Sequence, residues 1–256
     1  MLLLLFLLQR ARADGSRLRR RLESAARELE DLQTSFGRFA PAPIIERVIA
    51  HGVESRGEKK DVTVLFADLV GFTAIAESIE PQILVQILNG YFERMSHAIV
   101  SHRGHVSTFI GDGILALFGA LEPNPWQAND AAHAALAMQR ELADYGRELA
   151  AAGLPVLRIG IGLHRGTGVA ALVGSRELVQ FAFVGRVVNV AARVQTLTRD
   201  LGAPLIVTDA VRDALDPSFW TRELPPTRVK GVERPLVIFA LEGYAAGAPP
   251  RTGGTA

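Results

Sequence analysis

Cysteine is absent from this 256-residue chain, so it can form neither a disulfide nor a cysteine-ligated zinc site, as is typical of proteins from a reducing compartment. The acidic and basic residues nearly balance, with a net charge of +1. Because nucleic-acid-binding proteins usually carry an excess of basic residues, we expect no nucleic-acid partner. Hydrophobic residues make up 48% and charged residues 21%, which predicts a globular protein with a buried core. These properties leave the chemistry open.

The N-terminus carries an apolar run, Met1 to Leu8, that is too short to cross a bilayer, which takes about 20 apolar residues. Arginines follow it, at positions 10, 12, 17, 19, 20 and 21, an order opposite to that of a secretory signal. The order suits a transmembrane helix meeting its positive cytoplasmic flank. We therefore expect residues 1–8 to be the end of a truncated transmembrane helix, with a cytoplasmic domain attached to the inner membrane. A frayed apolar N-terminus is the alternative.

A heptad pattern follows within residues 9–60. Its apolar positions alternate in steps of four and three: Leu18, Leu22, Ala25, Leu29, Leu32 and Phe36. This seam predicts a helical coiled-coil segment that dimerises and carries signals, followed by a linker. A single amphipathic helix packed on its own domain is the alternative.

Residues 61–244 alternate strand-like and helix-like patterns, and residues 245–256 form a tail that we expect to be disordered. The order predicts an α+β domain of the ferredoxin-like (palm-like) kind, βααββαβ, with its helices on one face of the sheet. Expected strands cover 62–67, 105–110, 114–118, 157–164, 168–173, 205–208, 227–229 and 236–241. Expected helices cover 75–101, in two parts divided near Pro81, then 126–152, 187–199 and a short segment near Ala210.

Two aspartates stand where predicted strands end. Asp68 follows the first strand, and Asp112 lies at the tip of the predicted hairpin. A carboxylate at the end of a buried strand needs a compensating positive charge, and two of them together favour a hard divalent cation. Gly71 permits close approach of an anion to the backbone, and the amides of Phe72 and Thr73 open the next helix. Each aspartate taken alone favours a turn or cap residue, whereas the pair with its glycines favours metal.

Five segments, in this order, resemble the class III nucleotidyl cyclases, the adenylate/guanylate cyclase catalytic domain family. They are Val64–Thr73, Phe109–Phe118, Arg158–His164, Val184–Arg193 and Val229–Gly231. The resemblance implies metal-site residues Asp68, Leu69 and Asp112, catalytic residues Asn189 and Arg193, and phosphate-binding residues Gly71, Phe72, Thr73, Arg158 and Lys230. Within this family, the chain most resembles bacterial, membrane-linked adenylate cyclases.

The implied reaction converts ATP to 3′,5′-cyclic AMP and pyrophosphate, through in-line attack of the ribose 3′-oxygen on the α-phosphorus. Two divalent ions, Mg²⁺ or Mn²⁺, would assist, and positioning and charge stabilisation would dominate. The resemblance also implies a homodimer whose active sites lie between subunits. One chain would supply Asp68 and Asp112, and the other Asn189, Arg193 and Lys230.

The base-selecting positions depart from the family pattern. Adenine-selecting members carry Lys and Asp or Thr there, and guanine-selecting members carry Glu and a small polar residue. This chain has Thr108 and Ala182. An adenylate cyclase with relaxed selectivity, a guanine-using cyclase, and a catalytically silent nucleotide-sensing or dimerisation module therefore stay open. A diguanylate cyclase is disfavoured, because the segment Ile110–Gly113 is not the hairpin motif of that class.

Overall fold

The computed structural model describes residues 57–175, 179–230, 232 and 234–245. The predicted transmembrane end (1–8), the predicted coiled coil and residues 246–256 of the predicted tail lie outside this range. No helix within it is long and apolar enough to cross a membrane. The elements are β1 (Glu58–Leu69), α3 (Phe72–Ser78), α4 (Pro81–Ser101), β2 (His105–Ile110), β3 (Gly113–Phe118), α5 (Gln127–Ala151), β4 (Ile159–Gly174), β5 (Val179–Val184), α6 (Arg186–Asp200), β6 (Leu205–Thr208), α7 (Asp209–Arg212), β7 (Phe219–Thr227) and β8 (Leu236–Tyr244).

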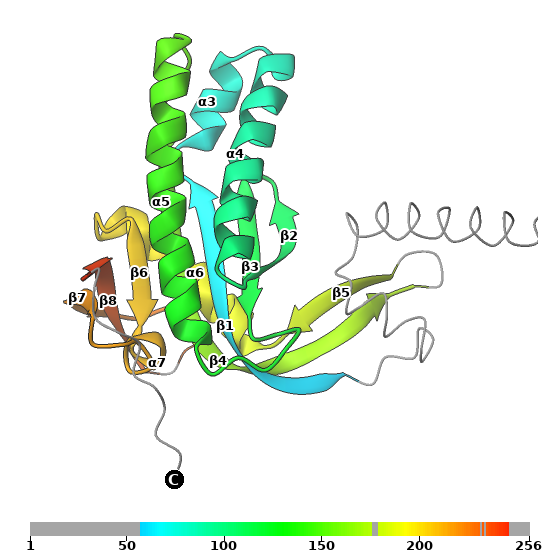
Figure 1. The fold of residues 1–256 in the computed structure, drawn as a ribbon, viewed down its shortest axis with the longest axis vertical. Coiled ribbons are helices and arrows are strands. Elements are labelled where there is room, and N and C mark those ends of the chain that lie inside the picture. The colour runs from blue at the N-terminus through cyan, green and yellow to red at the C-terminus, as the bar shows by residue number, and fades with distance from the viewer. Residues whose placement is uncertain (1–56, 176–178, 231, 233, 246–256) are drawn as a thin grey trace, which may run out of the picture. The chain divides into compact units, whose positions relative to one another are not determined.

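One mixed sheet organises the domain (Figure 1). Its strand order is β2-β3-β1-β4-β6-β8-β7, with β5 paired to β4 outside that path. All pairs are antiparallel except β4 with β6. The predicted hairpin and the division of the first helical stretch at Pro81 agree with the structure, in which Pro81 is the first residue of α4.

Three strand predictions differ from the structure. The two strands predicted at 157–164 and 168–173 are one strand, β4, because its middle residues stay paired with β1. Strand β5 was not predicted, and it forms a long hairpin with β4 that extends from the rest of the sheet (Figure 1). The strand predicted at 227–229 lies earlier, at β7, which contains Pro225 and Pro226. Proline interrupts a strand pattern in the sequence but is tolerated at a sheet edge, where β7 lies.

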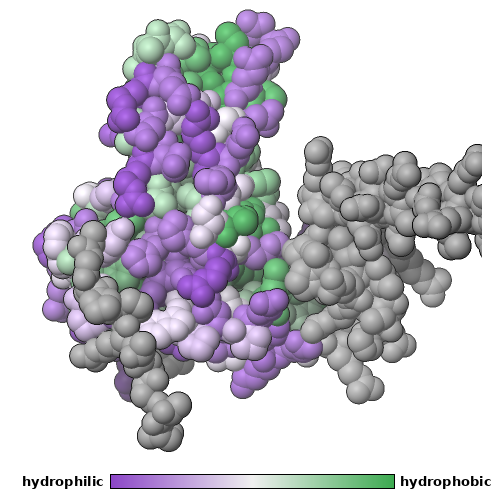
Figure 2. Space-filling model, viewed as in Figure 1, coloured by the Kyte–Doolittle hydropathy of each residue, from purple (hydrophilic) through white to green (hydrophobic). Residues whose placement is uncertain are grey.

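Both faces of the sheet carry helices, which corrects the prediction that the helices share one face. Leu65, Ala67 and Leu69 of β1 pack into the core with residues of α4 and α5, the helices in front of the sheet in Figure 1. Val62 and Val64, which alternate with them along the strand, pack instead with α6. The outer surface of α5 is largely hydrophilic (Figure 2), as expected of an amphipathic helix.

Two glycines of β4 bring α6 close to the sheet. A Cβ atom on Gly162 would overlap the backbone nitrogen of Gln195 and would lie 2.8 Å from the carbonyl oxygen of Ala191. A Cβ atom on Gly160 would overlap the hydroxyl of Thr198. At Gly162 the missing side chain lets helix backbone pack directly against strand backbone, whereas at Gly160 it makes room for the side chains of Thr198 and Gln195. Together these contacts fix the height of α6 above β4.

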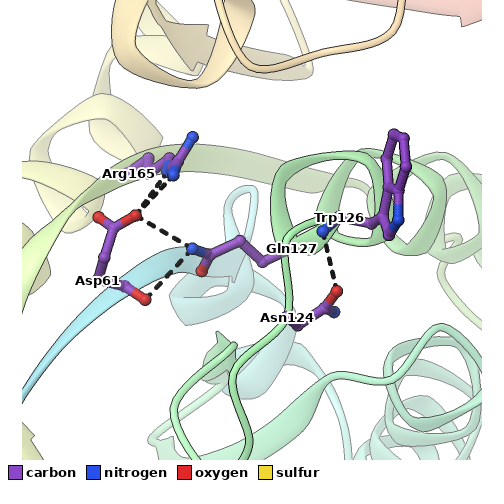
Figure 3. Close-up of polar contacts among 5 residues, drawn as sticks. All are labelled: Asp61, Asn124, Trp126, Gln127 and Arg165. Atoms are coloured by element: carbon purple, nitrogen blue, oxygen red, sulfur yellow. Dashed lines mark hydrogen bonds and ion pairs between the residues drawn. The ribbon is translucent and has the colours of Figure 1, made fainter. Parts of the chain in front are cut away.

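A polar cluster holds the early part of β1 (Figure 3). The guanidinium of Arg165 on β4 donates to Asp61 Oδ2 from Nε at 3.0 Å and from an Nη at 2.6 Å. Gln127, at the start of α5, donates from Nε2 to both the carbonyl oxygen and Oδ2 of Asp61, each at 3.2 Å. Asp61 thereby ties β1 to β4 and to α5, seven residues from the strand end that carries Asp68.

The close approach of α6 generates a stability prediction. We expect Gly162→Ala to lower the free energy of unfolding in urea by about 2 kcal/mol, because the new methyl group meets backbone that cannot move aside locally. Gly166→Ala, on the same strand, is the matched control, since its methyl group would make an ordinary 3.4 Å contact with Val187. Equal stabilities of the two variants would contradict the packing described for α6.

Candidate active site

The structure brings the two predicted metal aspartates together. Asp68 is the second-last residue of β1, and Asp112 occupies the turn between β2 and β3. The backbone N–H of Leu69 donates to Asp112 Oδ2 at 3.2 Å. Gly113 lies so close to β1 that a Cβ atom there would be 3.4 Å from Asp68 Oδ1. The turn itself depends on Gly111, whose φ of +62° is one that residues with a side chain rarely adopt.

The proximity of the two carboxylates perturbs their electrostatics. Burial, followed by the charge of Asp112 and a hydrogen bond with it, raises the pKa of Asp68 to about 6, although Arg199 opposes the rise. Burial and the same two carboxylates raise the pKa of Tyr91, whose fully buried hydroxyl has no hydrogen-bond partner in the described part of the chain. The pair is thus a partly desolvated concentration of negative charge, which stabilises any cation placed beside it.

Arg199 supplies a positive charge that the sequence reasoning missed. It lies in the last turn of α6 and donates from an Nη to the carbonyl oxygen of Leu69 at 3.1 Å. The same nitrogen is 3.5 Å from Asp68 Oδ2, the distance of a loose ion pair. The sequence did contain a signal for this role, because Arg199 is a basic residue on the same predicted helix as Asn189, ten positions further along.

These residues fit a hard divalent cation. Asp68, Asp112 and the carbonyl of Leu69 offer only oxygen, the donor that Mg²⁺ and Mn²⁺ prefer. The guanidinium of Arg199 already contacts two of these oxygens, which shows that they converge on one positive group. Residues 57–245, as far as they are described, contain no cluster of three or more His, Cys, Asp or Glu suited to a metal. A cation here would therefore complete its shell with water or substrate oxygens.

The predicted phosphate-binding residues divide into two groups. Gly71 precedes α3 with a φ of +74° and open space around its Cα, so the amides of Phe72 and Thr73 follow directly on the end of β1. The N–H of Val70 donates to the carbonyl oxygen of Arg158 at 2.7 Å, which places exposed Arg158 at the same end of the sheet. Lys230 is exposed beyond β7, and strands β4, β6 and β8 separate that strand from β1.

A single chain does not bring Asn189 and Arg193 to the acid pair. Helix α6 turns Val187, Val190, Ala191 and Val194 toward the sheet, whereas Asn189 is exposed and Arg193 is half-buried. Asn189 precedes Arg199 by ten residues, which is about 15 Å along a helix. Arg199 therefore stands near Asp68 in the last turn of α6, Asn189 stands near the opposite end, and Arg193 lies midway between the two ends.

The two predicted base-selecting positions lie on strands that approach each other. Thr108 is exposed on β2, and Ala182 is half-buried on β5. The rings of His105 on β2 and Phe181 on β5 are 6.0 Å apart between centroids. Within the described part of the chain, the hydroxyl of Thr108 makes one long hydrogen bond, to the carbonyl oxygen of Phe109 at 3.3 Å, so it is available to a ligand.

The close carboxylate pair generates a prediction for the metal-free protein. We expect Asp112→Asn to lower the pKa of Asp68 and to raise the thermal unfolding midpoint at pH 7.5 in EDTA, because it removes a like charge. An asparagine oxygen can still accept the N–H of Leu69. The variant should also lose its stabilisation by Mn²⁺. An unchanged or lower midpoint in EDTA would show that the two charges do not repel appreciably.

Comparison with known proteins supports one family. The adenylate and guanylate cyclase catalytic domain model matches residues 54–243. An adenylate cyclase of Anabaena cylindrica is 31% identical over 232 residues, which cover 86% of this chain and 45% of that protein. Adenylate cyclase 1 of Rhizobium meliloti (strain 1021) is 29% identical over 237 residues, which cover 92% of this chain and 36% of that protein. The chain thus spans less than half the length of these two relatives.

Solved structures share the fold. The guanylyl cyclase Cya2 superposes with a TM-score of 0.68 at 31% identity, covering 75% of this chain and 96% of that one. The adenylyl cyclase CyaB from P. aeruginosa superposes with a TM-score of 0.71 at 24% identity, covering 77% of this chain and all of that one. These matches confirm the predicted α+β fold, and with the family model they show that the chain belongs to the class III nucleotidyl cyclases.

Proposed function

We propose that this chain is the catalytic part of an adenylate cyclase that converts ATP to 3′,5′-cyclic AMP and pyrophosphate. The observation that carries the proposal is the convergence of Asp68, Asp112 and the Leu69 carbonyl at one end of the sheet. Two curated relatives named adenylate cyclase, at about 30% identity, favour ATP over GTP.

The first half of the site would hold the metal and the phosphates. Divalent cations bound there would activate the ribose 3′-hydroxyl and neutralise charge on the leaving pyrophosphate. Asp68 and Asp112 supply the negative charge that holds them. The exposed guanidinium of Arg158 would bind phosphate, and the amides from Gly71 to Thr73 would donate to phosphate oxygens. The protein's own contribution is positioning and charge stabilisation.

The second half of the site would complete the chemistry. Arg193 would stabilise the charge that develops on the α-phosphate, Asn189 would orient the ribose, and Lys230 would bind the terminal phosphates. Because Asn189 and Lys230 lie away from the acid pair within one chain, we propose that a second copy supplies them, together with Arg193 on the same helix as Asn189, in a homodimer with shared active sites. The hairpin of β4 and β5 favours such pairing, since it exposes Val169 (39%), Val173 (45%) and Val184 (56%).

We further propose that the dimer is attached to the inner membrane at or before residues 1–8 and that the heptad segment within 9–60 sets its geometry. The apolar run, its arginine flank and the heptad spacing support this. A rotation or shift of the paired heptad segments would then change how the half-sites meet.

A silent nucleotide-binding module is the second candidate, and the replacement of the usual base-selecting pair by Thr108 and Ala182 favours it. Purified chain incubated with ATP or GTP, in Mg²⁺ and in Mn²⁺, separates the candidates by product chromatography. Cyclic AMP that is lost in Asp112→Ala supports the enzyme. Nucleotide binding by a confirmed dimer, with no cyclic product from either nucleotide, supports the module.

The shared active site predicts complementation between two inactive variants. Asp112→Ala and Asn189→Ala should each lose cyclic AMP synthesis, because each removes one half of both sites. Co-expressed together, they should recover about a quarter of the wild-type rate, because half of the dimers formed at random are mixed and each mixed dimer has one intact site. Asp68→Asn with Asp112→Ala is the matched control and should stay inactive. Recovery in both pairs, or in neither, would refute sites divided in this way.

The base pocket yields a selectivity prediction. Supplying the family's adenine-selecting residues, as Thr108→Lys combined with Ala182→Asp, should raise the ratio of kcat/KM for ATP over GTP by about tenfold, because each added contact discriminates between purine edges. Initial rates with both nucleotides measure the ratio. An unchanged ratio would mean that neither position contacts the base.

A further inference from the structure

Arg199 and the proposed metal would use the same oxygens. One Nη of Arg199 lies 3.1 Å from the carbonyl oxygen of Leu69 and 3.5 Å from Asp68 Oδ2. Mg²⁺ binds oxygen at about 2.0–2.1 Å and requires near-octahedral geometry, so it would have to occupy the space on which these two oxygens converge. The guanidinium in this position and a metal ion on these ligands exclude each other.

We propose that Arg199 is a resident countercharge, which holds the acidic half-site while no metal is bound and competes with divalent cations for it. The inference rests on the proposed function, because it takes Asp68, Leu69 and Asp112 to be the metal site. It assigns to Arg199 a regulatory role: the residue lowers the metal affinity of the isolated half-site and so sets the metal concentration at which the site fills.

The surroundings of Arg199 suit a side chain that alternates between two positions. Its side chain is 50% exposed, so the guanidinium can leave toward solvent without disrupting the core. It stands in the last turn of α6, where the carbonyl groups at the helix end favour a cation. The displaced guanidinium would therefore remain stabilised. The backbone of α6 stays in place, because Gly160 and Gly162 hold the helix against β4.

The charges around the acid pair show what the guanidinium neutralises. Among the residues that the structure describes, Arg199 is the cationic side chain that contacts the acid pair, with an Nη 3.5 Å from Asp68 Oδ2. Asp112 has the backbone N–H of Leu69 as its partner. Removing the guanidinium should therefore leave the metal-free site with uncompensated negative charge, a state in which it binds a divalent cation more readily.

The test is Mn²⁺ binding to the purified full chain without nucleotide, with free Mn²⁺ measured by electron paramagnetic resonance. Arg199→Gln should lower the dissociation constant about two- to fivefold, the range expected for loss of a partly exposed ion pair. Arg199→Lys keeps the positive charge but lacks the planar guanidinium with its several N–H donors, and it should bind Mn²⁺ with intermediate affinity. Arg222→Gln is the matched control: it breaks a surface pair between Arg222 on the edge strand β7 and Glu242 on β8, and it should bind like the wild type.

Thermal unfolding supplies a second readout. In EDTA, Arg199→Gln should unfold at a lower temperature than the wild type, and saturating Mn²⁺ should raise its midpoint by more than it raises that of the wild type. Equal or weaker Mn²⁺ binding by Arg199→Gln, or unchanged affinity in both Arg199 variants, would overturn the competition. Wild-type binding that Asp112→Ala leaves intact, or no wild-type binding at all, would overturn the metal site itself, and with it this inference.

Discussion

Two carboxylates that share the end of a sheet repel each other, and much of the domain is arranged so that they can be held there. The turn between β2 and β3 places Asp112 beside the last residues of β1, where the N–H of Leu69 donates a hydrogen bond to its carboxylate. Burial and mutual repulsion raise the pKa of Asp68 to about 6, so a positive charge beside the pair stabilises its ionised form. In the protein alone that charge comes from Arg199, and during catalysis it would come from metal. In the proposed enzyme, the site would therefore hold a cation both with and without bound metal.

Helix α6 connects the two halves of the proposed chemistry while keeping them apart. Its C-terminal turn touches the acid pair through Arg199, and its outer face presents Asn189 nearer the other end. One rigid element thus serves the metal half-site of its own subunit and, in the proposed homodimer, the ribose and phosphates bound by the partner. A change in how two copies meet would alter both contributions together.

The sequence was most informative where a pattern is local. Asp68 after an apolar strand, Asp112 in a glycine-flanked turn and Pro81 at a helix start were all predicted and lie where expected. The prediction failed where distant segments decide the structure. Strand β4 continues through Arg165 because it pairs there with β1, which is far away in the sequence. Strand β7 tolerates two prolines because it lies at the edge of the sheet, and its local sequence does not show that position. Arg199 was missed for the same reason, since its contacts lie 130 positions earlier in the chain.

The close packing of α6 on two glycines of β4 affects how mutations in this domain should be interpreted. Gly160 and Gly162 are not among the predicted site residues, yet they set the separation between the helix that carries Asn189 and the sheet that carries Asp68. A methyl group would meet the backbone of α6 at Gly162 and the side chain of Thr198 at Gly160, and either would press on the helix without removing any reactive group. In a mutational scan for loss of turnover, these two glycines would score as if they were catalytic, and only a fold-sensitive measurement would reveal that they act as spacers.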